Sequence, residues 1–243
     1  MNYEIIGSNM QYLKVKLNKG EKFYGDSGNF VSKSDNAVME PKLAGGVMSA
    51  LERHWTGATA MLTEFSAKDD NATVTLSGVY PGKIYAIKLG PGEEFIAEHY
   101  AFLASDETVK ISMAAVNLGA AFFGKEGLLF QKFTGPGVVA IHVVGDIIEY
   151  KLDGTFNMEI DPGHLAAFDG GISYKIKFVD NIKTAMFGGV GLFLATMSGK
   201  GRVITHSVSR HKLTYAIYQD GLDQTQKKEG VRCQGSSAQR TSR

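Results

Sequence analysis

Similarity between distant segments, at fixed offsets, is the feature that most constrains the fold of this chain. Residues 17–23 match residues 89–95 at an offset of 72 positions. Residues 127–142 match residues 191–206 at an offset of 64, including the glycines of a Thr/Ser-Gly-x-Gly-x-Val motif and a histidine that follows it. Such periods indicate a chain built from one supersecondary unit used several times.

Further matches agree with these offsets. Residues 30–32 align with 102–104 at an offset of 72, residues 82–89 with 145–152 at 63, and residues 104–106 with 167–169 at 63, whereas a weaker match relates 62–67 to 130–135 at 68. We therefore expect three units at about 1–80, 81–143 and 144–210. An insertion around residues 40–57 enlarges the first unit.

Short runs of β-branched and aromatic residues, separated by turn residues, fill each unit. In the second unit these runs are 84–89, 95–103 and 109–113, with Gly-Pro-Gly and Ser-Asp between them. The one credible helix is 48–55, and no helices of 10 to 15 residues alternate with the strands. The pattern predicts an all-β chain and disfavours a parallel α/β sheet.

A unit of this size is too small to bury a core by itself. We expect three repeated β units packed around a pseudo-threefold axis as a β-sandwich or barrel, forming a single domain over residues 1–218. The polar composition of residues 219–243 predicts a flexible tail.

Composition excludes several classes of protein. The formal net charge is +1, so no global field attracts nucleic acid or an anionic membrane. The single cysteine, Cys233, lies in the polar tail, so no disulfide framework or catalytic thiol is expected. The start of the chain lacks the features of a secretory signal, and no apolar stretch approaches the roughly 18 residues that span a bilayer. These observations predict a cytoplasmic protein.

The repeated motifs also carry a family resemblance. Gly-Leu-Leu at 127–129 and Gly-Leu-Phe at 191–193 each precede a strand and the glycine motif, and Asp-Pro-Gly-His-Leu-Ala-Ala-Phe at 161–168 lies between them. Over roughly residues 1–210 the chain resembles the altered inheritance of mitochondria protein 24 family. The resemblance implies a fold similar to the tryptophan RNA-binding attenuation protein, triplicated in one chain. Mitochondrial members look like inner-membrane organisation factors, but this chain shows no transit peptide and resembles a bacterial or archaeal relative.

Histidines and carboxylates near two turns raise the alternative of a cupin-like metal enzyme. The candidate ligands are Glu93, Glu98, His99 and His164. Glu98 and His99 are adjacent on a predicted strand and would point to opposite faces, and the usual second histidine is replaced by Ala101. We favour turn or core roles for these residues and expect neither a metal nor another cofactor.

Two further arrangements have both a structural and a functional interpretation. His142 and His206 occupy matching positions, so symmetry could bring them together near the axis, although a strand histidine used twice is the simpler explanation. Basic and aromatic residues alternate as in single-stranded RNA-binding proteins, but also as on any solvated sheet face, which we favour. These residues are Tyr12, Lys14, Lys16, Tyr174, Lys175, Lys177, Phe178 and Lys183.

A glycine-rich apolar segment recurs in each unit, at residues 43–48, 118–124 and 185–190. If these loops emerge on one face, their large apolar side chains form an exposed patch for a protein partner, for self-association or for a membrane surface. If they fold inward, they cap the open end of the barrel. The candidate partner-binding residues are Met48, Phe122, Phe123, Met186 and Phe187.

The sequence contains no recognisable active site. We therefore predict a non-enzymatic scaffold or binding module that presents the apolar loops to a protein or membrane-surface partner, with nucleic acid the least favoured partner. The alternatives are a small-molecule or metal-dependent cupin-like enzyme and an RNA-binding protein.

Overall fold

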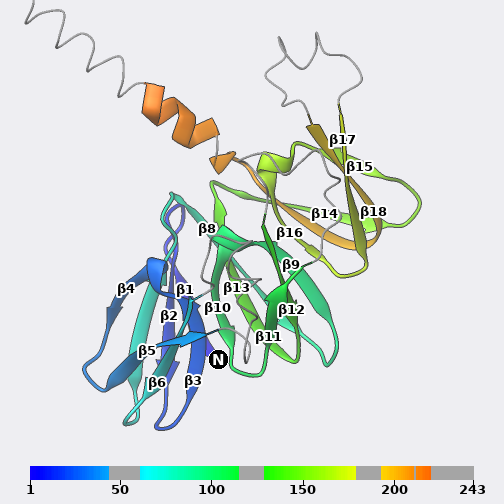
Figure 1. Ribbon diagram of the computed structural model, residues 1–243. Coiled ribbons are helices and arrows are strands. Elements are labelled where there is room, and N and C mark those ends of the chain that lie inside the picture. Colours follow the sequence, from blue (N-terminus) through cyan, green and yellow to red (C-terminus); the bar gives the residue numbers. More distant parts are fainter. Residues whose placement is uncertain (44–60, 115–128, 179–192, 211, 220–243) are drawn as a thin grey trace, which may run out of the picture.

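The computed structural model describes residues 1–43, 61–114, 129–178, 193–210 and 212–219. In these ranges the strands pair antiparallel, which confirms the all-β expectation (Figure 1). A short helix occupies residues 212–219, and no helix of the described ranges is long and apolar enough to cross a membrane. The predicted helix at 48–55 and the tail at 220–243 lie outside the described residues.

The strands form three sheets. The first sheet contains, in order, β1 (Asn2–Ile6), β2 (Tyr12–Leu17), β7 (Ala72–Ser77) and β4 (Phe30–Lys33). The second contains β5 (Ala37–Leu43), β6 (Met61–Ala67), β3 (Lys22–Asp26), β10 (Phe102–Asp106), β13 (Gly137–Val144) and β8 (Gly82–Leu89). The third contains β11 (Lys110–Met113), β12 (Phe130–Thr134), β9 (Glu94–Glu98), β16 (Leu165–Asp169), β18 (Phe193–His206) and β14 (Ile147–Asp153), with β15 (Met158–Ile160) and β17 (Ile172–Phe178) also paired to β18.

Alternating burial explains why these segments form strands. In β2 the side chains of Leu13, Val15 and Leu17 are buried, whereas Tyr12 and Lys16 face solvent. This period of two places one face of each strand in a core and the other in water. Three separate hydrophobic clusters result, centred on Phe23 and Phe65, on Phe95 and Phe133, and on Phe168 and Met197.

Two junctions connect the three cores through continuous backbone pairing. β3 pairs with β10, with Gly25 opposite Ala104, and β9 pairs with β16, with Ala97 opposite Ala167. Gly25 of the first junction corresponds to Ala97 of the second, which lies 72 positions later in the chain. Ala104 of the first junction corresponds to Ala167 of the second, which lies 63 positions later. These are the offsets found in the sequence, so residues that match in sequence make the same inter-strand contact twice.

Each junction is reinforced by one bulged residue. The register of β10 shifts between Phe102 and Ala104, and that of β16 shifts between Leu165 and Ala167. The bulge turns Leu103 into the core that precedes it along the chain, around Phe23 and Phe65, and turns Ala166 into the core around Phe95 and Phe133. Both side chains are fully buried. A β-bulge re-aims a side chain in this way.

The described strands do not close into a barrel or a ring. The first and second sheets each have two free ends, and the third, which branches at β18, ends at β11, β14, β15 and β17. Strands β4 and β15 lie at opposite ends of the molecule in Figure 1 and are not paired with each other. The barrel expected as one alternative is therefore absent from the described part of the chain, and a closed arrangement about a threefold axis stays a prediction.

The strand predicted at residues 95–103 is interrupted. A 3-10 helix, η2 (His99–Ala101), separates β9 from β10. Equivalent turns, η1 (Ser27–Asn29) and η4 (Pro162–His164), precede β4 and β16. The sequence does not reveal this turn, because residues 99–101 contain no glycine or proline and Tyr100 and Ala101 carry no turn signal of their own.

Truncating the bulged residue of the first junction should weaken the whole domain. Leu103→Ala removes a fully buried side chain from the core around Phe23 and Phe65. We expect the free energy of unfolding to fall by about 2–5 kcal/mol, as for other buried leucines, measured by urea denaturation. Val31→Ala, at the matching but exposed position of β4, serves as the control and should change stability by less than ~0.5 kcal/mol.

Candidate functional site

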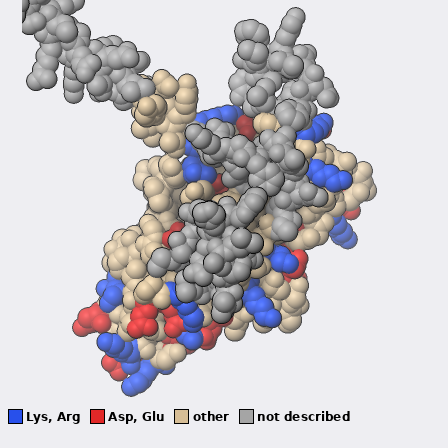
Figure 2. All heavy atoms as spheres, viewed as in Figure 1, with Lys and Arg blue, Asp and Glu red and all other residues tan. Residues whose placement is uncertain are grey.

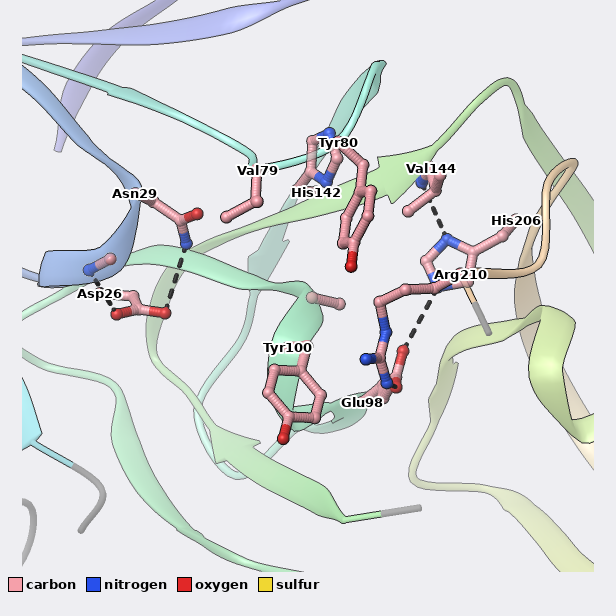
Figure 3. A pocket seen from close by; sticks show the side chains of 12 residues that line it. Asp26, Asn29, Val79, Tyr80, Glu98, Tyr100, His142, Val144, His206 and Arg210 are labelled. Carbon is pink, nitrogen blue, oxygen red and sulfur yellow. Dashed lines mark hydrogen bonds and ion pairs between the residues drawn. The ribbon is translucent and has the colours of Figure 1, made fainter. Parts of the chain in front are cut away.

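A cavity of about 260 Å³ lies where the segments around η1, η2, β13 and the end of β18 meet (Figure 3). Its wall combines two histidines, two acids and an arginine with aromatic and small residues. The lining residues are Asp26, Gly28, Asn29, Val79, Tyr80, Glu98, Tyr100, Ala101, His142, Val144, His206 and Arg210. It brings both of the matched histidines and a buried carboxylate into one wall.

Glu98, the last residue of β9, is the buried charge of this cavity, with 5% of its surface exposed. Arg210 donates from Nη2 to Glu98 Oε1 at 2.7 Å, and His206 Nε2 lies 3.5 Å from Oε2. Burial alone would raise the pKa of this carboxyl, but the contact with His206 and the charge and hydrogen bond of Arg210 outweigh burial and lower the pKa. Glu98 is therefore a carboxylate held by two partners.

His206 is held in one tautomer. Its Nδ1 accepts a hydrogen bond from the backbone N–H of Val144 at 3.0 Å, so Nδ1 carries no hydrogen. The ring hydrogen then sits on Nε2, which faces Glu98. His206 thus links the end of β13 to the acid at the end of β9.

Arg210 covers the outer side of Glu98. Its guanidinium lies 4.2 Å from the centre of the Tyr100 ring, in addition to the ion pair with Glu98. A cation above an aromatic face is favourable, and Figure 3 shows the arginine reaching between Tyr100 and His206. The segment that follows β18 is thereby attached to η2.

His142 lines the same cavity from β13. Burial and, to a smaller extent, the nearby His206 lower the pKa of its imidazole to about 4, while a hydrogen bond with the backbone of Tyr80 opposes the shift. A Cβ on Gly78 would approach the ring to 2.2 Å, so only glycine fits where the chain crosses it. The structure therefore brings the two matched histidines together around one cavity, both buried.

Glu98, His206 and Arg210 direct their polar atoms at one another or at the backbone. The described lining contains no Ser, Thr, Cys or Lys. The cluster joins chain segments that lie far apart in sequence.

The candidate metal ligands are dispersed. Glu93 accepts a hydrogen bond from the N–H of Gly90 at 2.7 Å within its own turn, and His164 Nδ1 lies 2.8 Å from the carbonyl of His206. His99 packs edge-on against Tyr100, and burial lowers the pKa of its imidazole. Over the described ranges no three His, Cys, Asp or Glu residues are placed to share a metal ion.

The basic and aromatic residues do not form one surface. Tyr174 is buried in the core with Phe130 and Phe168, and desolvation raises the pKa of its phenol. Lys16 and Lys177 are paired with Glu4 and Glu159. In Figure 2 lysine, arginine and acidic side chains mix over the end of the molecule that carries β3 to β6. Lys183 and the side chain of Phe178 lie outside the described residues.

The candidate partner-binding residues also lie outside the described residues. Met48 falls in the range 44–60, Phe122 and Phe123 in 115–128, and Met186 and Phe187 in 179–192. Their expected role stays a prediction.

Sequence reasoning did not single out Arg210 or Tyr100, which help to form the cavity. Glu98, the partner of Arg210, lies 112 positions away, and Arg210, the partner of Tyr100, lies 110 positions away. No motif surrounds either residue.

Breaking the buried ion pair should destabilise the fold. Arg210→Met leaves the carboxylate of Glu98 buried without its strongest partner, so we expect a loss of about 3 kcal/mol in the free energy of unfolding, measured by urea denaturation. Glu98→Gln combined with Arg210→Met should cost less than the sum of the two single changes. Additive losses would show that the two residues do not interact in solution.

Stability should fall on acidification because of His142. Its pKa of about 4 in the folded protein is below the value of 6.5 for the free side chain, so the unfolded chain binds more protons between these values. The free energy of unfolding should therefore decline as pH falls from 7 to 4.5, by on the order of 3 kcal/mol from this residue. His142→Gln should make the free energy of unfolding less dependent on pH over this range. Part of the decline should remain, because the pKa of His99 is also lowered in the folded protein.

Comparison with known proteins agrees with this architecture. An uncharacterised protein of Streptococcus pyogenes serotype M6, M6_Spy0233, is 27% identical over 213 residues, which cover 84% of this chain and 85% of that protein. The X-ray crystal structure of SPYM3_0169 from Streptococcus pyogenes has a TM-score of 0.73 at 22% identity, covering 90% of this chain and 98% of that one, and shows the same fold. The family model described as "Mitochondrial biogenesis AIM24" matches residues 3–208, so the chain belongs to the AIM24 family.

Proposed function

We propose that this protein is a non-enzymatic scaffold or binding module that presents its three glycine-rich apolar loops to a protein or membrane-surface partner. The observation that carries the proposal is where these loops are attached. Each one connects two adjacent, paired strands, namely β5 to β6, β11 to β12 and β17 to β18.

The strands that carry the loops occupy corresponding places. β6, β12 and β18 each pair on their other side with β3, β9 and β15, which precede the three 3-10 helices. A loop that recurs at the same place in a repeated arrangement is a common way to build one binding surface from several units. The candidate contact residues remain Met48, Phe122, Phe123, Met186 and Phe187.

The triplication itself supports this interpretation and is part of the proposal. Three 3-10 helices, three bulged strands and two junctions at matching positions support one ancestral unit similar to that of the tryptophan RNA-binding attenuation protein. The shared fold does not imply shared RNA binding. The self-bonded Glu98, His206 and Arg210 support a binding role over an enzymatic one.

The loops can be tested directly. Phe122→Asp combined with Met186→Asp should reduce binding to a protein partner or to anionic and neutral liposomes by about tenfold or more, because a charge at an apolar contact must be desolvated. Pull-down from a lysate and liposome flotation separate the two kinds of partner. Circular dichroism and urea denaturation should show an unchanged fold.

Ile148→Asp provides a matched control. Ile148 is an exposed apolar residue on β14, remote in sequence from the three loops, and 39% of its surface is exposed. This variant should bind like the original protein. Unchanged binding by the loop variant, with its fold intact, would remove the support for the proposal.

A further inference from the structure

The two terminal units each leave one strand edge unpaired at a position that is paired elsewhere in the chain. In the described structure β4 pairs with β7 alone, whereas its counterparts β10 and β16 also pair with β3 and β9. Likewise β15 pairs with β18 alone, whereas β3 and β9 each bind strands on both sides. Strands β5, β11 and β17, by contrast, are edges in every unit.

We propose that these two edges bind each other between two copies of this chain, with β15 of one copy pairing antiparallel with β4 of the next. The contact is the third instance of the junction that the chain makes twice within itself. It uses a different surface from the apolar loops and does not depend on their function. A head-to-tail contact of this kind closes into a ring or extends as a filament.

The exposed apolar residues of β4 support a missing partner. Phe30 and Val31 are 36% and 56% exposed, yet the matching Phe102 and Leu103 are 2% and 0% exposed. The register of β4 also shifts between Phe30 and Ser32, so Val31 is the bulged residue. Its counterparts Leu103 and Ala166 enter the core of the preceding unit. Val31 has no preceding unit in its own chain and enters the core beside β15 in another copy.

The known junctions also set the register of the new contact. Gly25 opposes Ala104 and Ala97 opposes Ala167, so the same offsets place Ile160 opposite Ser32 and Glu159 opposite Lys33. Ser34 donates its N–H to Thr73 of the first sheet at 2.9 Å. Because hydrogen-bonding directions alternate along an antiparallel strand, the N–H and C=O of Lys33 point to the free edge.

Charge complementarity agrees with this register. Glu159 is exposed and is paired with Lys177 at 2.5 Å, and Lys33 donates to the carbonyl of Ala37 at 2.6 Å. Both side chains lie at the surface, where such contacts exchange readily for others of similar strength. Opposite charges directly across a strand pair stabilise it, and like charges destabilise it.

Sedimentation of the full-length chain over a range of concentrations tests the proposal. The original protein should form dimers or larger species. Val31→Lys should weaken this association by about tenfold or more while the free energy of unfolding of the monomer stays the same. Met10→Lys, at a similarly exposed apolar residue in the turn between β1 and β2, should leave association unchanged.

A charge exchange makes the test specific. Lys33→Glu alone and Glu159→Lys alone should each weaken association, and the double variant, or an equimolar mixture of the two single variants, should restore it. A protein that stays monomeric at concentrations of about 10⁻⁴ M overturns the proposal, as does association unaffected by all three edge variants. Association lost only in the Phe122→Asp, Met186→Asp variant assigns self-contact to the loops and also overturns the edge contact.

Discussion

Backbone pairing across the junctions β3–β10 and β9–β16 is the interaction on which the rest of the structure depends. Each junction pairs a strand edge that would otherwise be free. Each also places a bulged side chain in an adjoining core, Leu103 in the core around Phe23 and Phe65 and Ala166 in the core around Phe95 and Phe133. Unpaired strand edges are a liability because their free N–H and C=O groups can pair with other chains. This constraint underlies the internal order of the described strands.

The buried cavity depends on the same junctions. Pairing of β9 with β16 positions Glu98 beside the end of β18, where His206 and Arg210 bind it. A carboxylate at this depth is tolerated only with such partners. The charged cluster therefore joins the second and third units electrostatically where the sheet already joins them by hydrogen bonds. The donors and acceptors of this cluster bond to groups of the protein itself, and the binding role proposed for the protein lies in its loops and edges.

Sequence reasoning was most successful where the physical signal was local. Alternating apolar residues such as Leu13, Val15 and Leu17 predicted strands, and the offsets of 72 and 63 predicted which residues make equivalent contacts. It was wrong for the strand at 95–103, where the turn at His99–Ala101 has no glycine or proline to mark it. Tyr174 looked like part of a basic surface, but its neighbours in the fold, Phe130 and Phe168, enclose it. The placement of the five candidate loop residues remains a prediction.

The sequence by itself determined the all-β character and the family, because both follow from the order and spacing of side chains along the chain. Only the tertiary structure decided that His142 and His206 share a cavity, that Arg210 binds Glu98, and that Val31 is exposed while Leu103 is buried. Matching residues are alike in sequence, but burial depends on whether a neighbouring unit is present in space. The first unit has a neighbour on one side only, and that difference arises from assembly in three dimensions.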